Sequence, residues 1–286
     1  GPLGSEFASW LKNGEQAESG THLRRVTRDG YITKKVWDTL GFSGQASILQ
    51  SSRRLTLMPA LCTAFEQEIE NLISVGENNT LRRCISKLDL GPAEESLLKE
   101  LSQFADIDSA ITTRASQKAA LDALKNCKTS LQKIAAQEKA AYTAYLTAEG
   151  FDPHHDAMVD CGWSLSSHRR TEEVCDQTFK GYYIGSLKHA HMHAKIRSFL
   201  FHKGSNPLWN TIAERGIELL ELPFASLEAQ VSRFEITPAG VTPVCVSSNP
   251  QYSHVSSLFI EDMQKEILNF AEFIKPFQDT LDLADI

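Results

Sequence analysis

The sequence lacks the features that mark several large classes of protein. Its six cysteines are widely spaced and none forms a C-x-x-C pair, so the sequence shows neither zinc-site spacing nor a disulfide framework. No apolar run approaches the roughly 20 residues that span a bilayer, and no signal peptide is found. We therefore expect a protein without a transmembrane segment, located in a reducing cytoplasm.

Positive charge is also scarce. The formal net charge is −7, and basic pairs such as Arg53-Arg54 and Arg169-Arg170 are scattered along the chain. Contacts to nucleic-acid phosphates need a concentrated basic surface. The sequence therefore argues against a nucleic-acid-binding protein.

The two ends of the chain carry the signals of a parallel sheet. Residues 23–27 predict a strand, residues 31–40 a helix ending at Gly41, and residues 46–50 a second strand. Strand, helix and strand form the unit of a parallel sheet. Further elements are predicted after residue 150: strands at 156–160 and 180–185 around a helix at 166–178, a short sheet segment at 218–222, a hairpin at 234–237 and 241–245, and a helix at 255–277.

The middle of the chain has a different pattern. Between residues 58 and 149, apolar residues recur three and four positions apart with almost no β-branched alternation, which predicts an insertion of about four helices. The sequence therefore predicts an α/β core from residues 8–57 and 150–286. Residues 1–7 are typical of the remnant of a tag-removing protease site and a cloning site, and we leave them out of the predicted fold.

The most informative stretch follows the apolar run that ends at Val159. It reads Asp160-Cys161-Gly162-Trp163-Ser164, at the carboxyl end of a predicted strand, where open α/β sheets place their ligands. Asp160 is therefore the first candidate for catalysis or metal binding. The alternative is that its carboxylate caps the following helix or braces the loop. Cys161 is interpreted as structural, because a neighbouring carboxylate raises the pKa of a thiol.

Several motifs, in order, resemble one family. They are Thr27-Arg28-Asp29-Gly30-Tyr31, then Ser51-Ser52-Arg53-Arg54 after the second strand, then Asp160-Cys161-Gly162-Trp163-Ser164, and then Lys180-Gly181-Tyr182-Tyr183-Ile184-Gly185. This order resembles haloacid-dehalogenase-like (HAD-like) domains of bacterial capsule and O-antigen polysaccharide biosynthesis proteins, which often accompany glycosyltransferase domains. The resemblance covers residues 23–277, loosely across the helical insertion. It implies a three-layer Rossmann-like parallel sheet, with residues 58–149 as a helical cap over the carboxyl edge.

The resemblance also implies roles for individual residues. Thr27 takes the place of the phosphate-binding Ser/Thr of the second motif, and Asp160 that of the fourth-motif acid that helps to hold Mg²⁺. The third-motif lysine is Lys133 or Lys128. The remaining residues expected to contact the ligand are Asp29, Gly162, Trp163 and Ser164. Asp29-Gly30 is also a common turn pair, and Tyr183 is expected in the core.

The departures from the family pattern concern catalysis. No Asp-x-Asp pair, whose first acid is the HAD nucleophile, occurs in residues 8–22, and Asp160 is followed by Cys161 instead of a second acid. A single carboxylate is a poor Mg²⁺ site. We therefore expect a catalytically degenerate or truncated module that binds a phosphorylated or nucleotide-linked sugar or supports a glycosyltransferase, in the cytoplasm or held at the inner membrane through its partners.

Three alternatives remain open at this point. The chain could be a protein-interaction scaffold without ligand chemistry. It could be an active Mg²⁺-dependent sugar phosphatase if an upstream strand supplies the nucleophile. A glycosyltransferase half-domain would need a glycine-rich turn for a nucleotide diphosphate, and the sequence offers no strong one.

One histidine-rich segment invites a metal interpretation. In His189-Ala190-His191-Met192-His193 all three imidazoles would share a face of a strand, but only His189 and His193 would do so on a helix. No acid or cysteine stands nearby at ligand spacing, so the sequence favours a surface segment over a metal site.

Overall fold

The protein has a mixed α/β fold built on a five-stranded parallel sheet with the order β2-β1-β3-β4-β5. The structure, a computed structural model, describes residues 2–17, 20–27, 29–187, 193–202, 216, 220–226, 228–245 and 254–277. The strands are β1 (His22–Val26), β2 (Ala46–Leu49), β3 (Asp156–Trp163), β4 (Lys180–Ser186) and β5 (Ile196–Phe201). None of the helices in the described residues is long and apolar enough to cross a membrane.

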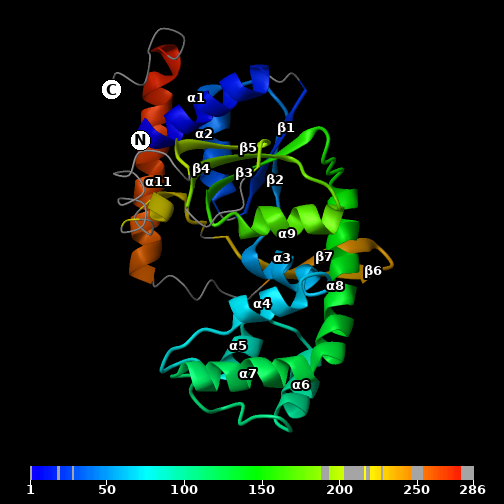
Figure 1. Ribbon diagram of the computed structural model, residues 1–286. Helices are drawn as coiled ribbons and strands as arrows, with labels where there is room; N and C mark the ends of the chain where they lie inside the picture. The colour runs from blue at the N-terminus through cyan, green and yellow to red at the C-terminus, as the bar shows by residue number, and fades with distance from the viewer. Residues whose placement is uncertain are drawn as a thin grey trace.

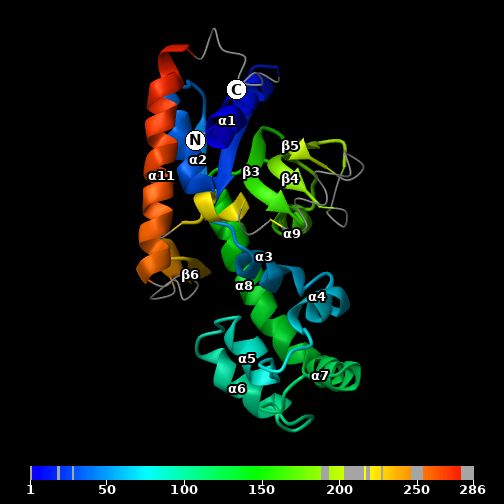
Figure 2. The same cartoon turned by 90° about the vertical axis from the view of Figure 1, so that its left-hand side faces the viewer.

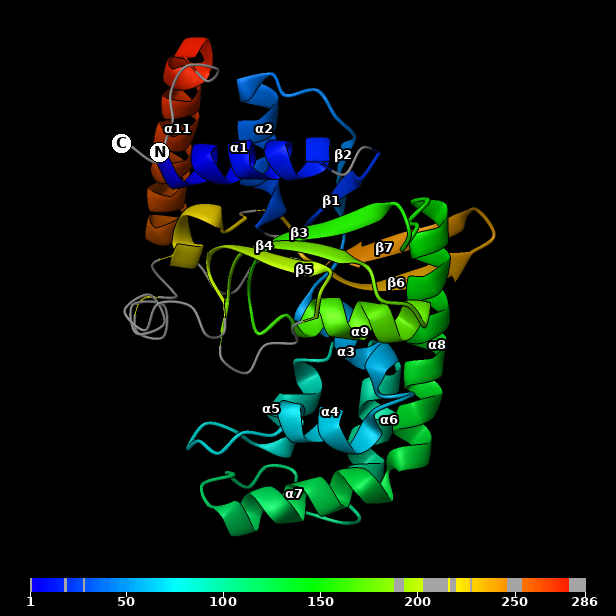
Figure 3. The ribbon, with the colours of Figure 1, turned by 45° about the horizontal axis from the view of Figure 1, so that its top comes forward.

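Helices cover both faces of the sheet (Figures 1 and 3). One face carries α1 (Pro2–Ala17), α2 (Gly30–Leu40) and α11 (His254–Ile274), which is followed by the short helix η2 (Lys275–Phe277). The other face carries α3 (Arg53–Ala60), α9 (Ser166–Cys175), the C-terminal half of α8 (Lys128–Ala148), and the hairpin of β6 (Val231–Thr237) and β7 (Gly240–Cys245). Each face has its own buried apolar cluster: Trp37 packs with Leu23 and Val159 on one side, and Tyr142 packs with Leu49 on the other.

The helical insertion forms a separate unit beside the sheet. It consists of α4 (Phe65–Leu72), α5 (Leu81–Ser86), α6 (Ala93–Leu101), α7 (Arg114–Asn126) and the first half of α8. A distinct core containing Met58, Leu124 and Leu131 holds these helices together. Figure 2 shows α8 running from the sheet into this unit, and its second half packs on the sheet through Tyr142 and Leu146. The helix predicted to close the insertion therefore belongs to both units.

Residues 2–7 are part of the folded molecule. They begin α1, whose apolar residues Leu3, Phe7 and Leu11 follow one another four positions apart and so share one helix face. Phe7 is fully buried, and Leu11 is 1% exposed. Leaving residues 1–7 out of the predicted fold therefore omitted part of the core.

Most of the predicted strands and helices are present. Two differences concern the sheet: one strand was not predicted, and one predicted sheet segment is helical. The strand β5 was not predicted. The segment predicted as sheet at 218–222 is instead helical over its described residues: Leu220 and Glu221 are helical, and Leu222–Phe224 form the short helix η1. Pro223 explains the difference, because it lacks an N–H group for a sheet ladder and favours the first positions of a helix.

Candidate binding site at the carboxyl edge of the sheet

The residues singled out in the sequence meet at one edge of the sheet. Because β1, β2, β3 and β4 run parallel, their carboxyl ends lie together. A pocket of about 540 Å³ opens there, and its lining includes Thr27, Asp29, Asp160, Gly162 and Ser164. The structure thus brings together five of the predicted ligand-contacting residues from strands that are more than 100 positions apart in sequence.

Thr27 joins the ends of β1 and β2. Its hydroxyl donates to the carbonyl oxygen of Ser51 at 3.0 Å and accepts from the Ser51 N–H at 3.2 Å. A hydroxyl has a single proton to donate. A hydrogen bond from Thr27 to a phosphate would therefore require this link to Ser51 to break.

Asp29 and Asp160 place two carboxylates in the pocket. An oxygen of Asp160 accepts the Cys161 N–H at 2.8 Å. Burial, and after it the charges of Asp29 and Asp160, raise the pKa of the Cys161 thiol well above its ordinary value. The thiol therefore stays protonated at neutral pH, as the structural interpretation of Cys161 predicted. Leu165 occupies the N-cap position of α9 and makes no side-chain cap hydrogen bond, so Asp160 is not the N-cap residue itself.

These two carboxylates also bear on the Mg²⁺ expectation. Mg²⁺ in phosphate sites is bound through one or two carboxylates, with phosphate oxygens and water as the other ligands. Asp160 alone would be a poor Mg²⁺ site, but Asp29 lines the same pocket and supplies a second carboxylate. The residues present therefore fit Mg²⁺ when a phosphate completes its coordination.

Gly162 allows the end of β3 to turn tightly against β4. Its φ is +107°, and a Cβ atom at this position would lie 2.2 Å from the carbonyl oxygen of Gly185. Any other residue would be strained by this φ and would also clash. Ser164, two residues on, is exposed and faces the pocket.

Trp163 is mainly a core residue. It is 4% exposed, its ring stacks on Phe201 with centroids 5.7 Å apart, and its indole N–H donates to Glu221. Only part of the side chain lines a neighbouring cleft. One face of the indole ring is therefore covered by Phe201 and is closed to a stacking sugar. Tyr183 is buried in the core as expected, at 1% exposure.

The cations of the pocket are not those that the sequence suggested. Lys133 is exposed on α8, about 22 Å along the helix axis from Ala148 at a rise of about 1.5 Å per residue, and Lys128 pairs with Glu66. Neither lines the pocket. The two lysines were chosen because they precede the strand that contains Asp160. This was a misleading guide, because α8 carries both lysines away from the sheet.

Arg53, Arg54 and Lys87 line the pocket instead. Arg54 pairs with Glu138, whereas Arg53 and Lys87 are exposed and make no ion pair with any residue that the structure describes. Arg53-Arg54 begins α3, the helix that comes next after β2, so strand order alone could have identified it. Lys87 directly follows α5 in the insertion, and no sequence signal links it to this edge.

Known families and curated proteins offer no match to this chain.

A second cleft, of about 910 Å³, adjoins the pocket and separates the sheet from the insertion. It is lined on one side by Gln67, Asn71 and Lys87 of the insertion, and on the other by Ser164 and Arg169 near the end of β3. The insertion therefore forms one wall of the hollow next to the carboxyl edge.

The wall is fixed by a buried ion cluster. Glu68 of α4, whose side chain is fully buried, accepts hydrogen bonds from Arg169 and Arg170 of α9. Burial alone would raise the pKa of the Glu68 carboxyl, but the hydrogen bonds of the two arginines outweigh it and hold the pKa below its ordinary value.

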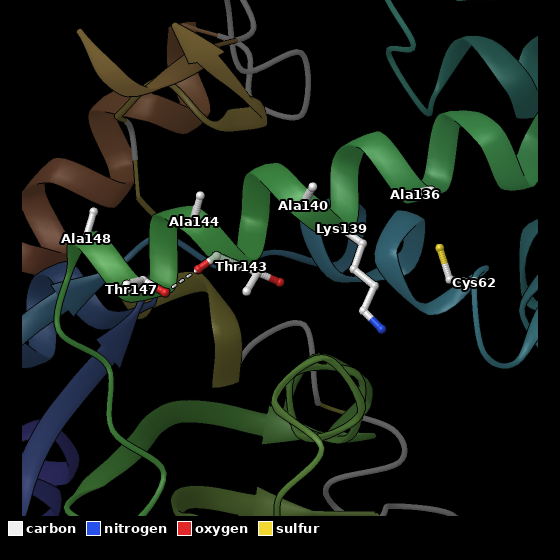
Figure 4. A pocket seen from close by; sticks show the side chains of 8 residues that line it. All are labelled: Cys62, Ala136, Lys139, Ala140, Thr143, Ala144, Thr147 and Ala148. Atoms are coloured by element: carbon white, nitrogen blue, oxygen red, sulfur yellow. Dashed lines mark hydrogen bonds between the residues drawn. The ribbon is translucent and has the colours of Figure 1, made fainter. Parts of the chain in front are cut away.

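A third hollow, along α8, offers less chemistry. It is lined by four alanines with Thr143, Thr147, Lys139 and Cys62 (Figure 4), and the Thr147 hydroxyl donates to the Thr143 carbonyl oxygen. Burial raises the pKa of the Cys62 thiol. The lining holds no acid and no histidine, so we assign it no chemistry.

The histidine-rich segment is described only in part. His189 and His191 lie outside the described residues, but His193 is described. Its Nε2 lies 2.8 Å from Glu172 Oε1 of α9. The argument that no acid stands near this segment is therefore wrong, because the fold brings one from α9.

Proposed function

We propose that this chain is a catalytically degenerate HAD-like module of bacterial surface-polysaccharide biosynthesis, which binds a phosphorylated or nucleotide-linked sugar at the carboxyl edge of β1, β2 and β3. The single observation that carries the proposal is the composition of one pocket. Asp29 and Asp160 share it with Arg53, Lys87 and the first turn of α9. The insertion, as the second wall, serves as the cap, and the module works in the cytoplasm or at the inner membrane through its partners.

The cationic groups suit a phosphate. Exposed guanidinium and ammonium groups form charge-assisted hydrogen bonds to phosphate oxygens. The N-cap residue of α9, Leu165, makes no side-chain cap hydrogen bond, and Ser166 and Ser167 of the first turn line the pocket. A helix start of this kind favours anions. Mg²⁺, held by Asp29 and Asp160, would neutralise further phosphate charge.

The order of the strands supports binding without hydrolysis. β1 is the first described strand along the chain, and Thr27-Arg28-Asp29 directly follows it, so this triplet corresponds in order to the Asp-x-Asp of HAD-like domains. Thr27 then occupies the nucleophile position, and Ser51, at the end of β2, occupies the second-motif position first given to Thr27. A threonine hydroxyl that donates to Ser51 cannot replace a carboxylate nucleophile, whereas the second acid, Asp29, is retained.

The sheet also bears on the phosphatase alternative. β1 pairs with β2 on one side and with β3 on the other, so a further strand could join this sheet only beyond β2 or β5. Neither place adjoins Asp160. We therefore favour a degenerate site over one completed by an upstream nucleophile strand.

Calorimetry tests the proposal directly. A hexose 1-phosphate and a uridine diphosphate sugar, each with Mg²⁺, are titrated into the protein and into the variants Arg53→Gln and Lys87→Gln. Loss of one hydrogen bond to a charged group costs about 1.5–3 kcal/mol, so we expect each variant to bind about 10–100-fold more weakly.

Matched controls exist in the insertion. Arg114 and Lys118 are exposed on α7 and line none of the pockets described above. Arg114→Gln and Lys118→Gln should leave both affinities unchanged. Equal weakening in the controls, or no heat from either sugar with the unmodified protein, would rule out this pocket as the binding site.

A supporting role for a glycosyltransferase is the second candidate. Phe259 and Phe273 of α11 are 57% and 70% exposed and stand almost four helical turns apart, hence on one side of the helix. Large exposed apolar side chains favour a protein contact. Stable capture of a glycosyltransferase domain that Phe273→Asp abolishes, with no heat from either sugar, would favour this candidate.

A further inference from the structure

Three side chains that the proposed function does not use form a cluster typical of a metal site. His168 and Glu172 stand one turn apart on α9, and His193 lies just before β5. Their potential ligand atoms all lie within 4.8 Å of one another. Nε2 of His168 and Nε2 of His193 lie 3.1 Å and 2.8 Å from the same oxygen, Oε1 of Glu172.

This geometry is close to that of a bound Zn²⁺. Zinc binds imidazole nitrogens and carboxylate oxygens at about 2.0–2.2 Å in a tetrahedron, which places ligand atoms roughly 3.3–3.5 Å from one another. The separations between Glu172 and the two histidines, 3.1 and 2.8 Å, are shorter by about 0.2–0.7 Å, a change within reach of side-chain rotations. We propose that His168, Glu172 and His193 form a three-ligand site for Zn²⁺, with the fourth position left to water or another ligand.

The surroundings hold two of the three ligands in place. The Tyr183 hydroxyl lies 2.7 Å from Nδ1 of His168, and the Phe179 N–H donates to Oε1 of Glu172 at 3.0 Å. With zinc on Nε2, the Nδ1–H of His168 donates to the Tyr183 oxygen, the outer-shell arrangement that orients metal-binding histidines. His168 is 1% exposed and Glu172 is 6% exposed, so both ligands are shielded from water.

Binding of Zn²⁺ would replace the two hydrogen bonds between the histidine Nε2 atoms and Glu172, and it requires one further contact to be given up. The Lys195 N–H donates to Nδ1 of His193 at 3.2 Å, and this nitrogen must carry a proton when Nε2 binds the metal. The bond is the longest of those that His168, Glu172 and His193 make to one another and to the neighbouring residues named above. Two imidazoles and one carboxylate favour Zn²⁺ over Mg²⁺, which prefers oxygen ligands alone.

The site would connect two segments of the fold. His168 also lines the pocket at the carboxyl edge. A metal on its Nε2 would join α9 to the chain entering β5 at the wall of that pocket. This role is separate from sugar binding, and its test needs no sugar or phosphate.

The test measures zinc content without any other ligand. The protein, carrying Cys245→Ser to remove an exposed thiol, is equilibrated with Zn²⁺ alone, freed of unbound metal by gel filtration and analysed by mass spectrometry. We expect about one zinc per chain, unchanged by excess Mg²⁺. His193→Gln should weaken binding by more than about 100-fold, beyond what loss of an outer-shell partner costs.

The variants are chosen to separate metal binding from folding. The amide that His193→Gln introduces can still donate to Glu172, so this variant should keep the fold while removing the ligand. His193→Cys supplies a thiolate and should restore zinc. His155→Gln is the control, since His155 forms a pair with Asp152 on the surface. Unchanged zinc affinity in His193→Gln, an equal loss in His155→Gln, or displacement by Mg²⁺ would each overturn the proposal.

Discussion

In the proposed function, one hydroxyl group just after β1 separates binding from hydrolysis. The proposal assigns Thr27 to the position of the carboxylate nucleophile, and the only proton of its hydroxyl is donated to the Ser51 carbonyl oxygen. The neighbouring acids Asp29 and Asp160 remain in the pocket. At the scale of single residues, the proposed site therefore keeps the groups that would bind Mg²⁺ and phosphate and lacks the group that would attack phosphorus.

This arrangement predicts a gain of function. Thr27→Asp places a carboxylate at the proposed nucleophile position, in the pocket that also holds the proposed Mg²⁺ ligands and the cations. We expect the variant to release phosphate from a hexose 1-phosphate in the presence of Mg²⁺, whereas the unmodified protein gives only the uncatalysed rate. Phosphate release is followed colorimetrically over hours.

The control combines Thr27→Asp with Asp160→Asn, which removes one proposed metal ligand. Phosphate release should return to the uncatalysed rate. Activity that persists in the double variant would exclude Asp160 from the mechanism, and a folded Thr27→Asp protein without activity would count against Thr27 as the nucleophile position.

At the scale of elements, the contact between α4 and α9 depends on one buried carboxylate. Glu68 accepts from Arg169 and Arg170, and its removal would leave both guanidinium groups without this partner. Loss of one member of a buried ion pair costs about 3–5 kcal/mol. We therefore expect Glu68→Gln to lower the free energy of unfolding by this amount near neutral pH, measured by urea denaturation.

Glu66→Gln is the matched control on the same helix. The Glu66 side chain is 58% exposed where it meets Lys125 and Lys128, and exposed pairs contribute about 0–1 kcal/mol. Its substitution should change stability by no more than that. Comparable losses in the two variants would show that burial of Glu68 does not strengthen the contact.

The pH dependence of this contact follows from the sign of the shift. The pKa of Glu68 in the folded protein is lower than its ordinary value of 4.5, so the folded state binds this proton less readily than the unfolded state. The stabilisation is complete above pH 4.5 and declines as pH falls through the lowered pKa. The difference in stability between the unmodified protein and Glu68→Gln should shrink over the same range.

Strands and helices with strong local patterns were predictable from sequence. The edge strand β5 and the division of α8 between the two units were not. The strand ending at Val26 and the helix ending at Gly41 agree with the prediction, because apolar spacing and a glycine C-cap are local signals. The strand β5 was missed because its middle residues are only half buried, which weakens the apolar signal.

The same division holds for the site. Asp160 and Asp29 were found because each lies at or just after the predicted carboxyl end of a strand, and parallel strands bring their ends together. Lys87 was missed, and neither Lys133 nor Lys128, the two candidates, lines the pocket, because the path of the insertion decides which lysine reaches it. The partners of His193 were missed for a related reason: Glu172 and His168 lie on a helix about 20 residues earlier, and only the fold brings them near.

At the scale of the whole molecule, two apolar cores share one continuous helix. The first half of α8 contributes Leu131 to the core of the insertion, and the second half contributes Tyr142 to a core against the sheet. Glu68 adds a second link through α9. Unfolding one unit alone would break α8 in its middle and expose the Glu68 cluster, so we infer that both units unfold together.

A substitution deep in the insertion tests this inference. Leu124 of α7 is fully buried in the insertion core, and Leu→Ala changes of this kind cost about 2–5 kcal/mol. The four tryptophans, Trp10, Trp37, Trp163 and Trp209, all lie outside residues 58–149. Tryptophan fluorescence therefore reports on residues outside the insertion, among them Trp10, Trp37 and Trp163 of the sheet unit, whereas far-ultraviolet circular dichroism reports on the helices of both units.

We expect Leu124→Ala to shift the urea midpoints of both signals equally, although no tryptophan lies in the insertion. Leu121→Ala, on the same helix but only partly buried, should shift both by a smaller and again equal amount. A fluorescence midpoint that stays in place while the dichroism midpoint falls would mean that the insertion unfolds by itself. In that case α8 and Glu68 would not couple the two cores, and the cleft between them could open without loss of the sheet.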